Sequence, residues 1–259
     1  MNIVVCVKRV PLTQEVDLEI DSTGKDIKKE PLAYVINDWD HYAIEEAVLL
    51  QEKFGGTVTA ITIGNEEDEE VLRRALAMGA AKAIRIDPGD LSLDGFVISR
   101  LLWAAVKDLP FELVLTGVQA NDDNCGMVGV MLAEHLGVAH TAVVTGVEVD
   151  GKEAELQIEL EGGIEEKSNI ELPALLTIQT GINVPRYVSI MGIRKARKKP
   201  LEVIKVSELG LPSEDLTPRT MIQEIYLPPD TEGAEMIEGN PSTVAEEIIR
   251  ILTEKGVNV

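Results

Sequence analysis

Short apolar runs alternate with amphipathic segments through the first half of the chain. Four runs rich in Val, Ile, Leu and Ala have the length and composition of buried strands: 2–7, 57–64, 83–87 and 111–117. Three longer segments carry apolar residues at helical spacing: 40–56, 67–80 and 96–109. Strands that are apolar on both faces and alternate with helices indicate a parallel sheet covered on both sides. The pattern therefore predicts a three-layer α/β/α fold with a mainly parallel sheet.

After Gly137 the pattern changes to alternating polar and apolar residues. Residues 141–181 contain two hairpin signals, Asp150-Gly151 and Gly162-Gly163. They predict an antiparallel hairpin region whose last strand, within 174–180, can rejoin the main sheet.

Helix boundaries and faces are also predicted. The first helix should end at Gly55 and place five residues on one face: Trp39, Ala43, Ala47, Leu50 and Phe54. The last helix should begin with a capping box formed by Thr243 and Glu246. Its buried stripe should consist of Ala245, Ile248, Ile249 and Leu252.

The distribution of proline and acidic residues divides the chain into two parts. Residues 207–243 are rich in both and lack a clear period, which is typical of an extended arm. We therefore expect an α/β domain over residues 1–206 and a C-terminal arm over 207–259 that ends in a helix.

Charge and cysteine content limit the possible partners and the compartment. The net charge of −21 disfavours nucleic acid and anionic membranes, because binding phosphates needs a basic surface. No apolar run approaches the roughly 20 residues of a membrane helix, and the first ten residues do not form a secretory signal. Cys6 and Cys125 have no spacing typical of a disulfide framework or a metal site, which favours a reducing cytoplasm. The three histidines also lack metal-ligand spacing.

The stretch LTGVQANDDNCGMVGVMLAEHLG, residues 115–137, joins a predicted strand to a helix through a polar loop. Ligands of open parallel sheets bind at the carboxyl ends of the strands, where we expect four segments to meet: 6–10, 37–40, 63–65 and 117–128. The first N–H groups of the helix can bind a phosphate, and Asn121 and Asn124 can bond a sugar or base. Alternatively, Asp122, Asp123 and Asn124 cap the helix and occupy the same N–H groups. Neither common phosphate fingerprint occurs, so both interpretations stay open.

A basic run at residues 194–199 stands out in so acidic a chain. It follows the apolar segment VSIMGI, residues 188–193. The run is either a solvated helix end or part of a docking element for another protein.

Several motifs in a fixed order connect the chain to a known family. They are VVCVKRVP, INDWDHYAIEEAVLL, RRALAMGA, LVLTGVQANDD, LEGG followed by ELPALLTI, and NVPRY followed by IRKARKKPLEVIK. As a set they resemble the β (small) subunit of electron transfer flavoproteins over nearly the whole chain.

The resemblance implies an electron carrier rather than a stand-alone enzyme. A larger α subunit would hold the redox FAD, and this chain would bind an adenine nucleotide, with AMP favoured over a second FAD. The acidic loop NDDNCGMVG is closer to the AMP-binding group, whereas Asp38 and Trp39 replace a common Pro-containing version. By position the nucleotide-binding residues would be Cys6, Val7, Lys8, Asn37, Asp38, Trp39, Asp40, Ile63, Gly64, Gly117, Gln119, Ala120, Asn121, Asp122, Asp123, Asn124, Cys125, Gly126 and Val128.

The resemblance also implies protein partners. Five residues would dock acyl-CoA or other dehydrogenases: Arg186, Tyr187, Ile190, Met191 and Lys195. Glu159 would lie near the flavin domain of the α subunit, and the arm would wrap that subunit.

Three alternatives remain at this stage. An electron-bifurcating member would hold a second FAD in place of AMP. A chain of another class would be a stand-alone protein that binds or hydrolyses a nucleotide. A pure scaffold subunit would have no nucleotide in its cleft.

Overall fold

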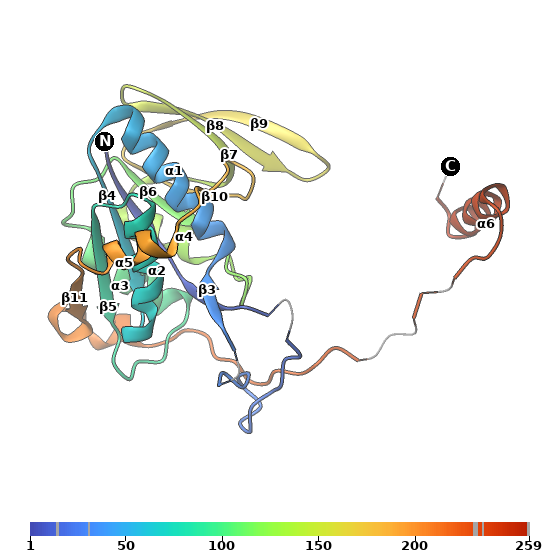
Figure 1. Ribbon diagram of the computed structural model, residues 1–259, viewed down its shortest axis with the longest axis horizontal. Helices are drawn as coiled ribbons and strands as arrows, with labels where there is room; N and C mark the ends of the chain where they lie inside the picture. Colours follow the sequence, from blue (N-terminus) through green and yellow to red (C-terminus); the bar gives the residue numbers. More distant parts are fainter. Residues whose placement is uncertain (14–15, 31, 230–232, 235, 258–259) are drawn as a thin grey trace. The chain divides into compact units, whose positions relative to one another are not determined.

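Strands and helices alternate through the first half of the chain in the order that the apolar pattern predicts (Figure 1). The computed structural model describes residues 1–13, 16–30, 32–229, 233–234 and 236–257. Its strands are β1 (Asn2–Cys6), β2 (Arg9–Pro11), β3 (Tyr34–Ile36), β4 (Thr57–Ile63), β5 (Lys82–Asp87), β6 (Leu113–Gly117), β7 (Ala139–Asp150), β8 (Glu153–Leu160), β9 (Ile164–Glu171), β10 (Ala174–Ile178) and β11 (Glu202–Lys205). Its helices are α1 (Asp38–Phe54), α2 (Glu69–Met78), α3 (Gly95–Val106), α4 (Val128–Leu136), α5 (Ile190–Ala196) and α6 (Pro241–Glu254).

The main sheet of the described residues has nine strands in the order β11-β5-β4-β1-β6-β10-β7-β8-β9. Neighbours from β11 to β7 run parallel, and β7, β8 and β9 pair antiparallel. The strand β10 rejoins the parallel part between β6 and β7. The predicted fold class is therefore confirmed. The short strands β2 and β3 form a separate antiparallel pair.

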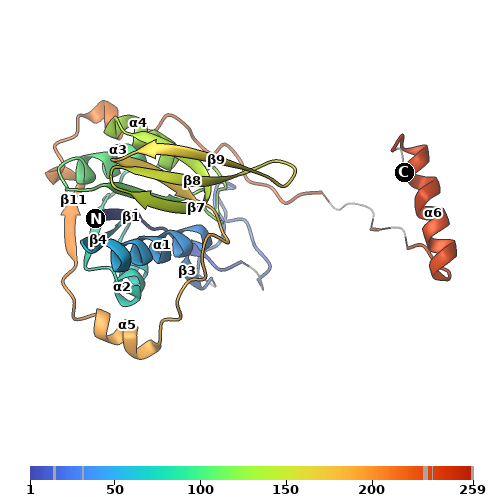
Figure 2. The same ribbon diagram turned by 90° about the horizontal axis from the view of Figure 1, so that it is seen from above.

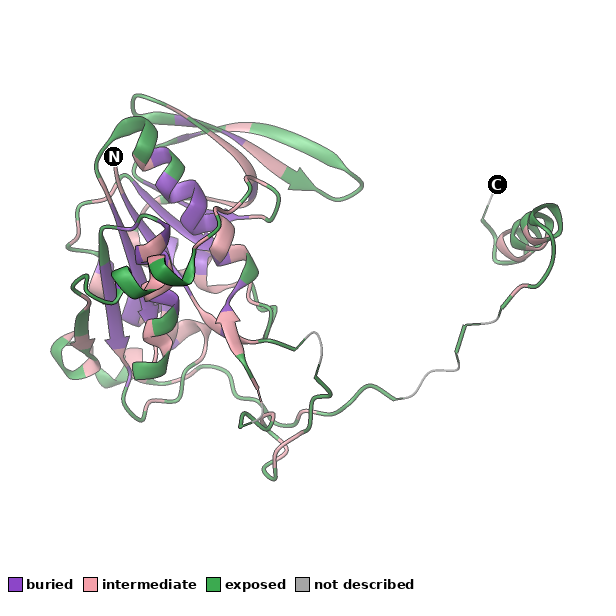
Figure 3. Ribbon diagram, in the orientation of Figure 1, coloured by how far each residue is buried: buried purple, intermediate pink, exposed green. Residues whose placement is uncertain are grey.

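Helices cover both faces of this sheet, as Figure 2 shows. In β1, Ile3 and Val5 pack with the core formed by α1 and α2, whereas Val4 and Cys6 pack with the core formed by α3 and α4. Successive strand residues point to opposite faces, so a strand covered on both sides must be apolar throughout. Figure 3 shows this burial along the central strands.

The antiparallel region forms a ribbon with its turns at the predicted glycines (Figure 1). Gly151, Gly162 and Gly163 have φ angles of 62°, 80° and 75°. Positive φ is strained for residues with a Cβ, so glycine is suited to these turns.

Helix α1 confirms the predicted end at Gly55 and part of the predicted apolar face. Ala43, Ala47 and Leu50 are buried, and the helix ends at Gly55, which has a φ of 73°. Trp39 is only half-buried, and Phe54 is 40% exposed. Phe54 lies in the last turn of the helix rather than in the core. The ammonium of Lys53 is 5.0 Å from the centre of the Phe54 ring.

A glycine lets helix α4 lie close to the sheet. A Cβ added to Gly129 would be 2.6 Å from Oγ1 of Thr116 and 2.7 Å from Cγ2 of Thr177. These residues belong to β6 and β10, so the small side chain sets the position of the α4 N-terminus over the ends of both strands.

The residues after 199 form a strand and pack against the core of the α/β domain, which their composition does not predict. Residues 202–205 form β11, an edge strand that the sequence reading missed. Four following residues pack against the core on the α3 and α4 face: Val206, Leu209, Leu211 and Leu216. The first compact unit comprises Met1–Gln223 and the second Glu224–Val259. The first unit thus continues past the expected boundary at residue 206.

The second unit contains helix α6, whose start and burial differ from the prediction. Asn240 is the N-cap, accepting hydrogen bonds from the N–H groups of Ser242 and Thr243, and Pro241 takes the first helical position. The predicted capping box of Thr243 and Glu246 is therefore wrong. Within the second unit the predicted stripe is not buried either: Ala245, Ile248 and Ile249 are exposed and Leu252 is half-buried. Among the described helices, none has both the length and the apolar character required to span a bilayer.

Candidate functional site

The carboxylate of Asp40 joins three segments at the carboxyl edge of the sheet. Its Oδ2 accepts a hydrogen bond of 2.7 Å from the backbone N–H of Lys8, and its Oδ1 accepts one of 3.1 Å from that of Gly117. Burial raises the pKa of Asp40 to about 7, although these N–H donors act in the opposite direction. The side chain fixes the end of β1, the first turn of α1 and the end of β6 to one another.

A second set of hydrogen bonds ties the polar loop to the start of α1. The side chain of Asn37 donates to the carbonyl of Gln119 (2.8 Å) and accepts from the N–H of Asn121 (3.0 Å). The side chain of Asn121 accepts from the N–H of Asp38 (3.1 Å) and donates to its carboxylate (3.0 Å). The Asn121 amide, which the sequence predicts to bond a sugar or base, thus forms hydrogen bonds within the protein.

Lys8 lies between the two aspartates of the loop. Its Nζ is 2.7 Å from Oδ1 of Asp122 and 2.9 Å from Oδ2 of Asp123. Partial burial opposes the charge on Lys8, but the two carboxylates prevail and raise its pKa. One positive charge therefore offsets part of the two negative charges that would repel a nearby phosphate.

The start of helix α4 corrects the predicted cap. The helix begins at Val128, and its N-cap residue, Met127, makes no side-chain capping hydrogen bond. Asp122, Asp123 and Asn124 do not cap it, because Asp123 accepts instead from the N–H of Cys125 (3.0 Å) and pairs with Lys8. Among the described residues, no side chain accepts from the first N–H groups of α4, and such groups attract an anion.

Glycines allow the backbone to take this shape. A Cβ on Gly117 would be 2.5 Å from Oδ1 of Asp40 and 2.6 Å from Cβ of Trp39. Gly126 has a φ of 61°, and Asn124 before it has a φ of 50°. The strand end and the loop thus depend on residues that tolerate close approach or left-handed backbone.

The remaining candidates after β1 and β4 shape the edge from the other side. Burial raises the pKa of the Cys6 thiol, which packs in the core. Val7 donates its N–H to the carbonyl of Ile61, and Gly64 donates to that of Ile86. Ile63 and Gly64 take no part in the hydrogen bonds that join residues 37–40 to residues 117–121 within the described residues.

Gln179 connects Trp39 to Glu159, and the sequence reading missed it. The indole N–H of Trp39 donates to Oε1 of Gln179 (2.8 Å), and Nε2 of Gln179 donates to Oε2 of Glu159 (2.8 Å). Gln179 directly follows β10, so the rule that sites lie at carboxyl ends of parallel strands would have included it.

A family model described as an electron transfer flavoprotein domain matches residues 27–209. The β subunit of the electron transfer flavoprotein from Bacillus subtilis (strain 168) is 42% identical over 254 residues, which cover 97% of each chain. The chain belongs to the electron transfer flavoprotein β-subunit family.

Other relatives match this chain over a similar length. The human electron transfer flavoprotein β subunit is 32% identical over 258 residues, or 97% of this chain and 99% of the human one. CarD, a subunit of the caffeyl-CoA reductase-Etf complex of Acetobacterium woodii, is 33% identical over 265 residues, or 99% of this chain and all of CarD.

The segment from Arg186 to Lys199 of this chain has both internal contacts and an exposed apolar tip. The guanidinium of Arg186 pairs with Glu45 (2.9 Å) and Glu52 (2.8 Å) of α1, and this pairing raises its pKa. The ammonium of Lys199 donates to the carbonyls of Leu76 and Ala80, near the C-terminal end of α2.

Helix α5 lies between these two anchors. Tyr187 before it is 90% exposed, and Ile190 in its first turn is 79% exposed. Met191 and Lys195 are exposed as well. The segment thus holds an exposed apolar tip outside the core.

Proposed function

We propose that this chain is the small subunit of a heterodimeric electron transfer flavoprotein and binds an adenine nucleotide, with AMP favoured, at the edge formed by 6–8, 37–40 and 117–128. The observation that carries the proposal is the uncapped start of α4 beside the ends of β6 and β10. A phosphate bound there would accept from its N–H groups.

The charges and amides around this edge fit a nucleotide monophosphate. Lys8 holds Asp122 and Asp123, which lowers the repulsion between their carboxylates and a phosphate. The side-chain amides of Gln119 and Asn124 form no hydrogen bond within the described residues and can bond a sugar or base. The bound nucleotide would stabilise the native chain, since a ligand that binds only the folded state raises its stability.

The redox chemistry in this proposal belongs to a second polypeptide. An α subunit holds the FAD, and this chain helps to exclude water from it. The part of the arm beyond the first compact unit, Glu224–Val259, would wrap the α subunit, which would cover the exposed apolar residues of α6. Glu159 lies on β8 and contacts the same subunit. The complex would work in the cytoplasm.

Electrons would reach the flavin from acyl-CoA or other dehydrogenases that dock on the segment around α5. Its apolar tip, Ile190 and Met191, is exposed, and Arg186 anchors the segment to α1. Tyr187 and Lys195 flank this tip and would complete the contact.

The test is mass spectrometry of the small molecules released when the complex with its α subunit is denatured. AMP together with one FAD per heterodimer would support the proposal. A second FAD in place of AMP would assign the chain to the bifurcating type. Absence of any nucleotide besides the α-subunit FAD would contradict the proposed site, and ATP turnover by the chain alone would favour a stand-alone nucleotide hydrolase.

A further inference from the structure

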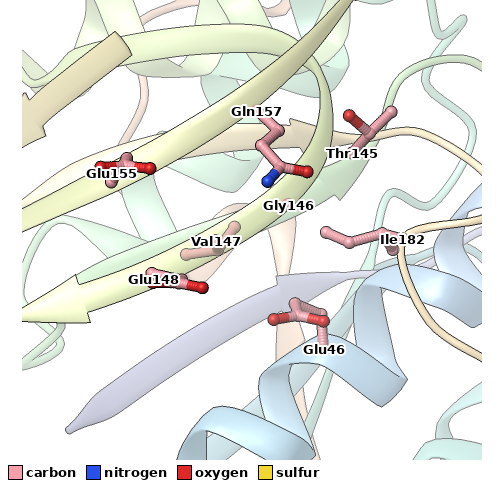
Figure 4. A pocket seen from close by; sticks show the side chains of 8 residues that line it. All are labelled: Glu46, Thr145, Gly146, Val147, Glu148, Glu155, Gln157 and Ile182. Atoms are coloured by element: carbon pink, nitrogen blue, oxygen red, sulfur yellow. The ribbon is translucent and has the colours of Figure 1, made fainter. Parts of the chain in front are cut away.

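A pocket of about 250 Å³ lies between α1 and the antiparallel ribbon (Figure 4). Figure 4 shows Glu46 on the helix opposite the residues of β7 and β8. The residues that line the pocket include three acids and neither lysine nor arginine: Glu46, Thr145, Gly146, Val147, Glu148, Glu155, Gln157 and Ile182.

Glu46 is a buried acid that lacks a cation within the described residues. It is 8% exposed, and its Oε2 accepts one hydrogen bond of 3.0 Å, from the amide of Asn183. Burial raises the pKa of Glu46, and the charge of neighbouring Glu45 adds to the rise. A buried carboxylate without a cation is unfavourable, so a positive charge entering the pocket would be stabilised.

Two further buried oxygens, one on a residue that lines the pocket and one on the partner of Glu46, lack a hydrogen bond among the described residues. Oγ1 of Thr145 and Oδ1 of Asn183 are buried and make no hydrogen bond. Thr145 lines the pocket, and Asn183 is bonded to the carboxylate of Glu46. Because buried polar atoms are almost always paired, the excess of acceptors calls for a ligand with several N–H donors.

The ribbon around the pocket repeats the excess of negative charge. Glu148 lies directly opposite Glu155, Asp150 opposite Glu153, and Glu153 opposite Glu171. Like charges that face each other across strands destabilise a sheet. Among the described residues, only Glu155 of these acids has a salt bridge, with Lys167 (3.1 Å), so the face stays acidic and is complementary to a basic protein surface.

The positively charged ligand that fits this pocket must be larger than a metal ion. No group of three or more His, Cys, Asp or Glu in the described residues can hold a metal ion. A guanidinium is cationic and carries five donors in a planar fork, so it can reach acceptors on different sides of the pocket.

The acidic face continues along β8 to Glu159. Glu155, Gln157 and Glu159 alternate along the strand and share one face. We infer that the pocket receives the guanidinium of an arginine of the α subunit, which pairs with Glu46 and bonds Thr145. The inference rests on the proposed function, because it requires that subunit.

The test measures the affinity of the full chain for its α subunit. Glu46→Gln keeps the shape of the side chain and removes its charge, and we expect a loss of affinity of at least about 30-fold. Thr145→Val should weaken binding by about threefold to tenfold. Glu134→Gln is the matched control, because it removes one charge from an exposed site on α4, on the opposite face of the sheet, and should leave the affinity unchanged.

Two further measurements separate a contact from a fold defect. Urea denaturation of the isolated chain should show that Glu46→Gln is as stable as the wild type or more so, because the change removes an uncompensated buried charge. A structure of the heterodimer should show an arginine of the α subunit in the pocket. Water, a metal ion or a lysine there would overturn the inference.

The outcomes for the inference and for the proposed function differ. If the wild-type chain binds the α subunit and Glu46→Gln binds it equally well, the inference fails and the proposed function stands. If the wild-type chain does not bind an α subunit, both fail.

Discussion

Asp40→Asn tests whether one buried carboxylate sets the pH dependence of stability at the candidate site. Burial raises the pKa of Asp40 to about 7 from an ordinary value of 3.8. The folded chain then holds the proton more tightly than the unfolded chain. The free energy of unfolding is therefore highest below the ordinary pKa, and it falls as the pH rises through the folded pKa.

The size of the effect follows from the pKa difference. Each pKa unit corresponds to about 1.4 kcal/mol, so full ionisation of Asp40 lowers the free energy of unfolding by about 4 kcal/mol. Asparagine has the shape of the protonated acid and one acceptor for the N–H groups of Lys8 and Gly117, but it does not ionise. The free energy of unfolding of Asp40→Asn, relative to that of the wild type, should therefore rise by about 2 kcal/mol between about pH 5.5 and about pH 8.5.

The assay is urea denaturation of both chains across this pH range. Asp108→Asn serves as a control, because it makes the same chemical change at an exposed residue beyond α3 and should give a difference that does not vary with pH. A pH-independent difference for Asp40→Asn, or one that falls as the pH rises, would refute the reasoning. It would show that the N–H donors of Lys8 and Gly117 outweigh burial.

Three other changes test the fold, the loop and the docking segment. Gly129→Ala should lower the free energy of unfolding by about 1–3 kcal/mol in urea, because the methyl overpacks α4 against the sheet; Gly192→Ala, a helical glycine with ordinary contacts, should not lower it. Lys8→Met should weaken AMP binding by about tenfold in calorimetric titration, since it leaves two aspartates uncompensated beside the phosphate, and unchanged affinity would argue against a nucleotide at this edge. Ile190→Ala should slow electron uptake from a dehydrogenase in stopped-flow measurements without changing the nucleotide content, and an equal rate would remove the docking role.

The sequence predicts the strands and helices well where burial leaves a strong pattern. The run Asn2–Cys6 is apolar throughout because helices cover both of its faces, and this alone indicates a central parallel strand. The convergence of Asn37 and Asp40 with the loop after Gly117 follows from a general rule about strand ends.

Other features depend on partners that are far apart in sequence. Asp122 and Asp123 have the composition of helix caps, but Lys8, more than a hundred residues earlier, holds both of them. The edge strand β11 is short and becomes recognisable through its pairing with β5. Helix α6 has the predicted apolar spacing, yet within the second unit none of its residues is buried. Such contacts leave no local signal, so a reading of neighbouring residues misses them.

A structure of the heterodimer with its bound nucleotide tests the central claim most directly. We predict an adenine nucleotide at the carboxyl ends of β1 and β6, with its phosphate accepting hydrogen bonds from the first N–H groups of α4. A complete heterodimer whose edge is filled by side chains, with no nucleotide against α4, would contradict the account.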